Sequence, residues 1–204
     1  GAGEWRRWRG KGIAVFGQAP EFEWNSRLTI RQHLDEVLAL AGRGQVRKTA
    51  SEWMLRLYEV GVIEPENLME RKPGELPPLV LRRLQLGLAL IRGAKIWLVD
   101  EPGRGLDAAS RGTWLDLLRE RARAEDAAVV LATRSARDIC RAADRAGVIR
   151  EGEWLEEGTL DDLMASPRHA ETHDWFLGLP SVDSPRERIP ERNEGGGRSD
   201  VPSM

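Results

Sequence analysis

The sequence has little of what marks several classes of protein. Its single cysteine, Cys140, excludes an intramolecular disulfide, and no Cys or Cys/His metal-binding spacing occurs. No signal peptide is recognisable, and no apolar run approaches the ~20 residues that a membrane-spanning helix needs. The net charge of −2 lacks the strongly basic character typical of nucleic-acid-binding proteins. We therefore expect a cytoplasmic protein that reaches a membrane, if at all, through a partner.

What is present fits an ordinary soluble protein. Hydrophobic residues make up 41% and charged residues 31% of 204 residues, which suggests one domain, or one domain with a smaller subdomain. Basic residues cluster only near the start of the chain, where two tryptophans separate them: Arg6, Arg7, Arg9 and Lys11, with Trp5 and Trp8. This run is interpreted as a solvated arm, the alternative being contact with phosphates or anionic lipid.

Hydrophobic periodicity predicts an α/β fold. Short apolar runs typical of buried strands occur at residues 12–17, 96–99 and 128–132, and residues 147–149 begin a further strand that pairs with 154–155. Strands that alternate with helices in the second half indicate a parallel sheet. Amphipathic or buried helices are predicted at residues 30–42, 45–60 and 79–91, so the first half contributes an inserted helical subdomain.

These patterns divide the chain into four segments. Residues 1–28 form an N-terminal arm, the first strand and a loop, and residues 29–92 form the helical subdomain. Residues 93–180 form the α/β core, and residues 181–204 are rich in Pro, Gly, Ser and charge, which predicts a disordered tail.

The strongest motif is IWLVDEPGRGLD, at residues 96–107. It resembles the Walker B strand and D-loop of ABC ATPases. A buried strand carries Asp100 to its end, where a carboxylate can hold Mg²⁺ directly or through water, and Glu101 follows to polarise an attacking water. The alternative is structural: both carboxylates cap a neighbouring helix or satisfy buried donors. Asp107, in the D-loop, is interpreted mainly as the support of a turn or interface.

Further stretches resemble the oligopeptide, dipeptide and nickel importers of that family, in the family's order. Residues 13–30 resemble its Q-loop, roughly IAMIFQDPMTSLNPVLTI, with matches at Gln18, Pro20, Asn25, Leu28, Thr29 and Ile30. Residues 73–90 resemble the signature region, roughly PHELSGGMRQRVMIAMAL, and Arg83 matches a family arginine. Residues 142–158 and 166–180 resemble ADRVAVMYAGRIVEEG and SPRHPYTRALLASIP. The resemblance implies an ATP-binding subunit that works in head-to-tail dimers beside a membrane subunit.

The resemblance also implies roles for particular residues. Gln18 would sense a nucleotide. The loop that would face a membrane subunit contains the candidate partner-interface residues Trp24, Asn25 and Arg27. Arg134 stands where the family has its switch histidine, because ATRSA replaces ITHDL; an arginine can contact phosphate but cannot take the neutral hydrogen-bonding role of histidine.

Two nucleotide-binding motifs depart from the family pattern. No GxxxxGK[ST] P-loop precedes Gln18, and GKG at residues 10–12 is no substitute for it. The family's Leu-Ser-Gly-Gly-Gln is replaced by Leu76, Pro77, Pro78, Leu79 and Val80. The replacement loses a hydroxyl, removes two N–H donors and adds a side chain where glycine allows close approach.

These departures favour a degenerate, non-catalytic subunit of a peptide- or nickel-type transporter, with no bound cofactor. It would act structurally or in regulation through a membrane subunit, an active ATP-binding subunit, or both. One alternative is an ATPase that hydrolyses ATP with Mg²⁺ to drive import, its P-loop supplied by another chain or a missing segment. Another is a scaffold that reuses the fold outside transport. A degraded gene product is disfavoured because the hydrophobic pattern is intact.

Loss of the P-loop strand and its helix, a truncation at the N-terminus, has a consequence for the sheet. Apolar surface on residues 96–99 and 128–131 would be exposed and would need a cover. The N-terminal arm, a partner or a second copy could provide it. We therefore expect an oligomer or an obligate complex.

Overall fold

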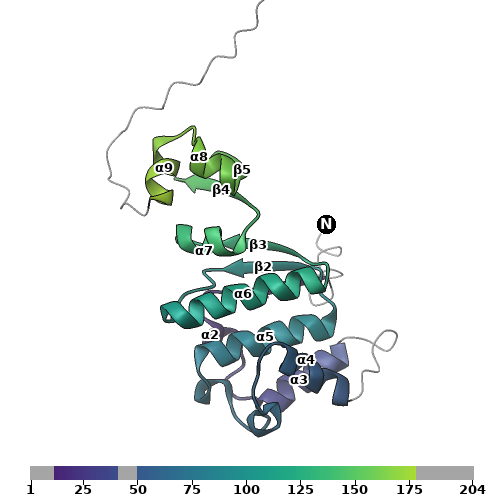
Figure 1. Ribbon diagram of the computed structural model, residues 1–204. Coiled ribbons are helices and arrows are strands. Elements are labelled where there is room, and N and C mark those ends of the chain that lie inside the picture. The colour runs from purple at the N-terminus through teal and green to yellow at the C-terminus, as the bar shows by residue number, and fades with distance from the viewer. Residues whose placement is uncertain (1–11, 41–49, 178–204) are drawn as a thin grey trace, which may run out of the picture. The chain divides into compact units, whose positions relative to one another are not determined.

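The computed structural model describes residues 12–40 and 50–177 (Figure 1). It divides into two compact units, one that ends at Ala143 and one that begins at Asp144. The basic N-terminal arm, the expected start of the second helix at residues 45–49 and the expected tail lie outside the described residues. The finer division into four segments stays a prediction.

A three-stranded parallel sheet is the centre of the first unit. Its strands are β1 (Ile13–Phe16), β2 (Ile96–Asp100) and β3 (Ala128–Ala132), in the order β1-β2-β3. Parallel neighbours require crossover connections, and helices supply them. The α/β fold predicted from the sequence, with its parallel sheet, is confirmed. All three strands therefore end at the same edge of the sheet.

One face of the sheet packs on the hydrophobic core. Trp97 and Val99 of β2 are buried, and the ring of Phe16 in β1 meets Trp97 edge-on with 6.3 Å between ring centroids. The indole N–H of Trp97 donates to the carbonyl of Ala94 at 2.9 Å, so this buried polar atom is satisfied. The helices α6 (Ala108–Ala124) and α7 (Ala136–Ala142) complete this unit.

Helices fill the sequence between β1 and β2, as expected for the helical subdomain. They are α2 (Pro20–Glu23), α3 (Ile30–Leu40), α4 (Ala50–Glu59), two 3-10 turns η1 (Pro65–Leu68) and η2 (Pro73–Glu75), and α5 (Pro78–Arg92). The helices α2, α3, α4 and α6 all contact α5, which is the central helix (Figure 1). The residues of α5 are mostly apolar on almost every side of the helix, and most of them are buried, as is typical of a helix inside a core.

The second unit is a β-hairpin with two short helices. Strands β4 (Arg145–Arg150) and β5 (Glu153–Thr159) are antiparallel, and α8 (Leu160–Ala165) and α9 (Ala170–Phe176) follow. The two turn residues, Glu151 and Gly152, both have positive φ, as the favoured two-residue hairpin turn requires. The expected pairing of residues 147–149 with residues 154–155 is confirmed in the β4–β5 hairpin, where Ile149 lies opposite Trp154.

The other face of the parallel sheet bears a row of apolar side chains. Val15 lies opposite Leu98 in the register, and Leu98 lies opposite Val130. Val15 is 65% exposed and Val130 is 60% exposed, and no other described residue of the first unit covers them. The expected exposure of apolar surface on β2 and β3 is thus found on this face, whereas Val99 points the opposite way and is buried. We call Val15, Leu98 and Val130 the bare row.

Two valines on adjacent strands allow a matched test of this asymmetry. Val99→Ala should lower the free energy of unfolding by about 2 kcal/mol, because it removes buried methyl groups and leaves a cavity. Val15→Ala should change it by less than about 0.5 kcal/mol, as at other exposed positions. Urea unfolding followed by circular dichroism measures both. Equal losses would show that a segment or a second copy covers the bare row in solution.

Candidate functional site

Polar side chains meet at the edge where the three parallel strands end. Asp100 is the last residue of β2 and Glu101 follows it, while Gln18 and Arg134 each lie two residues beyond β1 and β3. The structure adds Arg104, from the loop between β2 and α6, to these four residues. We call the five residues the strand-end cluster. Open α/β sheets bind ligands at this edge.

Gln18 connects two members of the strand-end cluster. Its side-chain N–H donates to Asp100 Oδ2 at 3.1 Å, and its Oε1 accepts from Arg104 Nη1. Both ends of the amide are therefore engaged, and Asp100 gains a neutral donor. The roles expected of Gln18 and Asp100 stay predictions.

Glu101 pairs with Arg134 at the end of β3. Its Oε1 accepts from the backbone N–H of Arg134 and from the guanidinium Nε, both at 3.1 Å. The φ of Glu101 is +43°, a left-handed conformation that is rare outside glycine, and its own N–H donates to the Ala132 carbonyl. The Arg134 side chain is 91% exposed, so the ion pair contributes less than about 1 kcal/mol.

Asp107 caps helix α6. Its carboxylate accepts from the N–H groups of Ala109 and Ser110 at 3.0 Å each and from the Ser110 hydroxyl at 2.6 Å. The Ser110 hydroxyl, followed by the backbone N–H of Ser110, lowers the pKa of Asp107. Its described contacts are local ones with the first turn of α6. A turn-supporting role accounts for this residue without a nucleotide.

The loop expected to meet a partner is fixed by a buried tryptophan. Trp24 is 7% exposed and belongs to the core, and its ring meets the ring of His33 edge-on at 4.8 Å. The expectation that Trp24 itself contacts a partner is thereby corrected. His33 Nε2 accepts from the Asn25 N–H at 3.1 Å, and Asn25 Oδ1 accepts from the Arg27 N–H at 3.0 Å. Asn25 and Arg27 are exposed and remain available.

The residues that replace the family signature form the first turn of α5. Pro77 is the N-cap residue and Pro78 the first helical residue, so neither nitrogen carries a hydrogen. The N–H groups of Val80 and Leu81 both donate to the Pro77 carbonyl, at 3.0 and 3.1 Å. Helix N-termini bind anions through free N–H groups. At the start of α5, two of these groups are absent because of the prolines, and two are bonded to the Pro77 carbonyl.

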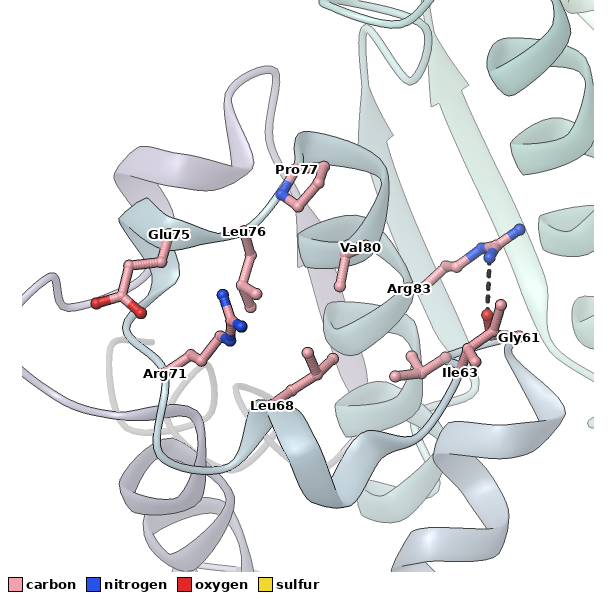
Figure 2. A pocket seen from close by; sticks show the side chains of 10 residues that line it. Gly61, Ile63, Leu68, Arg71, Glu75, Leu76, Pro77, Val80 and Arg83 are labelled. Atoms are coloured by element: carbon pink, nitrogen blue, oxygen red, sulfur yellow. Dashed lines mark hydrogen bonds between the residues drawn. The ribbon is translucent and has the colours of Figure 1, made fainter.

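A pocket of about 260 Å³ lies beside this helix start (Figure 2). Its wall is mostly apolar, and Arg71 and Glu75 contribute the charged groups near Leu76. Arg83 contributes to the wall and donates from Nη1 to the Gly61 carbonyl at 2.7 Å. The lining residues are Gly61, Val62, Ile63, Leu68, Arg71, Glu75, Leu76, Pro77, Val80 and Arg83.

The charges of the strand-end cluster bear on whether Mg²⁺ fits there. Two carboxylates, Asp100 and Glu101, face two guanidinium groups, Arg104 and Arg134, so the four side chains carry no net charge. Arg104 also donates to Gln18 Oε1, the other end of the amide that contacts Asp100. Among the described residues, no group of three or more acidic, His or Cys side chains is placed to hold a metal. In this arrangement the two guanidinium groups offset the charge of the carboxylates that could hold a divalent cation.

Sequence reasoning did not find two arginines of this region. Arg104 lies in the GRG stretch between Glu101 and Asp107, where the two flanking glycines were the only signal. Arg82 is completely buried in α5 and contacts the backbone of the loops that carry Gln18 and Arg104. Its place in a predominantly apolar helix gave no indication of that contact.

Comparison with known sequences gives consistent relatives, although no family model matches the chain. The oligopeptide transport ATP-binding protein AppD of Bacillus subtilis is 27% identical over 182 residues, 89% of this chain and 55% of the relative. The dipeptide transport ATP-binding protein DppD of the same organism is 28% identical over 180 residues, 88% of this chain and 54% of the relative. The chain spans about half the length of the curated relatives it matches.

Solved structures agree on the fold. The ATP-binding cassette MJ0796, as a dimer bound to ADP and phosphate, gives a TM-score of 0.65 at 21% identity over 78% of this chain and 68% of that chain. The protein cbiO1 of Clostridium perfringens, part of the ABC transporter complex cbiONQ, gives a TM-score of 0.63 at 20% identity, over 79% of this chain and 62% of that chain. The chain is therefore a relative of the ATP-binding subunits of oligopeptide and dipeptide ABC transporters, with the fold of an ATP-binding cassette.

Proposed function

We propose that the chain is a non-catalytic ATP-binding-cassette component of a peptide-type importer. It assembles with a membrane subunit or an active ATP-binding subunit and serves structure or regulation there. The relatives supply the transporter context, since their names are those of oligopeptide and dipeptide transport ATP-binding proteins. The observation that carries the non-catalytic part is the first turn of α5, built on Pro77 and Pro78.

A phosphate bound at a helix start needs unpaired N–H groups that point at it. Two successive prolines contribute none, and the N–H groups of Val80 and Leu81 already donate to the Pro77 carbonyl. Leu79 adds a side chain where the family has glycine, which restricts how closely a ligand can approach the backbone. This helix start is consequently a poor partner for a nucleotide held by an opposite subunit.

The strand-end cluster supports the same proposal. Glu101, the carboxylate that would polarise water, accepts two hydrogen bonds from Arg134 at Oε1, so this oxygen is already engaged. Gln18, which would meet a metal or water, is bonded to Asp100 and Arg104 instead. The polar groups satisfy one another, as in a structural cluster.

A second candidate is an ATPase whose P-loop comes from another chain or segment. The contact between Gln18 and Asp100 favours it, because it preserves the neighbourhood that nucleotide chemistry would use. ATP and Mg²⁺ would then be cofactors, with Asp100 the metal ligand and Glu101 the group that polarises water. Binding would have to displace Arg104 from Gln18.

A scaffold outside transport would instead bind no transporter subunit.

The proposal also concerns location. No helix of the described residues is long and apolar enough to cross a bilayer. A position at the inner face of the membrane would come from a membrane subunit bound at the loop of Asn25 and Arg27, whose exposed side chains follow the buried Trp24.

Titration of the purified chain with Mg-ATP to millimolar concentration, followed by calorimetry, tests nucleotide binding. We expect no saturable heat and no rise in melting temperature, because the strand-end cluster is neutral and self-paired. An active ATP-binding subunit of an oligopeptide importer is the positive control. Saturable binding, lost on Asp100→Asn, would instead support the ATPase candidate.

A mixed pair with that active subunit tests the α5 start. Replacing Pro77, Pro78 and Leu79 by Ser, Gly and Gly restores a hydroxyl and two N–H donors, so ATP hydrolysis by the pair should rise at least about tenfold. Glu75→Gln, an exposed change that leaves the helix start intact, is the control. Full hydrolysis by the pair with the unmodified chain would contradict the proposal, and failure to form a pair in light scattering would contradict its assembly part.

A further inference from the structure

Arg82 is a buried cation with an unusual set of partners. Its side chain is 0% exposed, and its guanidinium donates to three backbone carbonyls: those of Gln18 at 3.0 Å, Arg104 at 2.8 Å and Gly17 at 3.5 Å. Among the described residues it forms no ion pair within 4.0 Å, and its Nε has no hydrogen-bond partner. Burial lowers the pKa of Arg82, because removing a charge from water is costly, while the carboxylates of Glu21 and Glu23 act in the opposite direction without a direct ion pair.

The carbonyls that Arg82 holds belong to two separate loops. Residues 17–28, between β1 and α3 and including the short helix α2, are called the first loop, and residues 101–106, after β2, the second loop. The loops also meet through side chains, because Arg104 Nη1 donates to Gln18 Oε1. Arg82, Gln18 and Arg104 therefore form a closed ring of hydrogen bonds in which each residue touches the other two.

Helix α5 holds the first loop at a second point. One turn beyond Arg82, the side-chain N–H of Gln85 donates to Glu23 Oε2 at 2.8 Å. Glu23 also accepts from the backbone N–H of Gly17, and a Cβ at Gly17 would lie 1.9 Å from Glu23 Oε1. A side chain at this position would therefore displace the Glu23 carboxylate from its present place. The first loop is therefore bonded to α5 at two points, through Arg82 and through Gln85, whereas the second loop is bonded to α5 through Arg82.

We propose that Arg82 is a positioning residue that joins the first and second loops into one unit that opens cooperatively. The planar guanidinium fork presents donors in fixed directions, so the carbonyls of Gln18 and Arg104 are held at one spacing. That spacing sets the contact of Gln18 with Asp100, and through it the shape of the strand-end cluster. The inference depends only on these contacts and stands whether or not the cluster binds a nucleotide.

A purely space-filling role would leave a different signature. An apolar side chain of similar volume would fill the same space without the cost of a buried charge, and such exchanges are often neutral or stabilising. It would, however, leave the carbonyls of both loops without their shared donor. In Arg82→Met, therefore, the free energy of unfolding should change little while the coupling of the two loops is lost. Only the loss of coupling distinguishes the proposal from a space-filling role.

Native-state amide hydrogen exchange at increasing denaturant measures that coupling. Phe22 and Leu28 report on the first loop, because their N–H groups donate to the Ala19 and Asn25 carbonyls. Arg104 and Leu106 report on the second loop through bonds to the Glu101 and Gly103 carbonyls. In the unmodified chain we expect both pairs to share one opening equilibrium, so that their exchange rates converge on one dependence on denaturant.

In Arg82→Met the two dependences should separate, with at least one loop exchanging ten times faster or more while the amides of α6 keep their rates. Arg83→Met is the matched control, because Arg83 is the adjacent arginine of α5 and holds only the Gly61 carbonyl, outside both loops. It should leave the two loops coupled. Arg82→Gln, which is uncharged and shorter, provides the same measurement if the methionine variant does not fold.

Three results would overturn the proposal. Independent opening of the two loops in the unmodified chain would show that no such unit exists. Persistent coupling in the Arg82 variants would show that other contacts join the loops. Equal acceleration of every amide, α6 included, would show that Arg82 acts only on global stability.

Discussion

Burial of helix α5 is the constraint on which the rest of the first unit depends. The helix contacts α2, α3, α4, α6 and β1, so one segment supplies apolar surface to the sheet and to the helical part together. The same helix starts at Pro77 and Pro78 and carries Arg82 and Gln85 to the loops beside the sheet. Packing of α5 thus fixes the geometry of both the strand-end cluster and the helix start at Pro77 and Pro78.

The sequence predicted the sheet because local patterns encode it. Four apolar residues before Asp100 indicate a buried strand, and the parallel register with Ala128–Ala132 places Asp100, Glu101 and Arg134 at one edge. The position of Trp24 could not be predicted in this way. A tryptophan in a polar loop is typical of an exposed contact surface. Only its packing against His33 shows that Trp24 belongs to the core.

Contacts between distant residues account for most of what the sequence did not reveal. Arg82 reaches a carbonyl 64 positions away, and Arg104 reaches a side chain 86 positions away. Periodicity describes which face of a helix is apolar, and it carries no information about which loops meet that face. The pairing of Glu101 with Arg134 was equally hidden, although both residues had been singled out for other roles.

The bare row of Val15, Leu98 and Val130 has a thermodynamic consequence. Apolar groups that are hydrated in the folded state are not newly exposed on unfolding, so they add nothing to the heat-capacity increment. A chain with one sheet face open to water will therefore have a smaller increment per residue than a cassette whose sheet is covered on both faces. Its stability will vary less steeply with temperature away from the maximum, and association that covers this face will carry a negative heat-capacity change of its own.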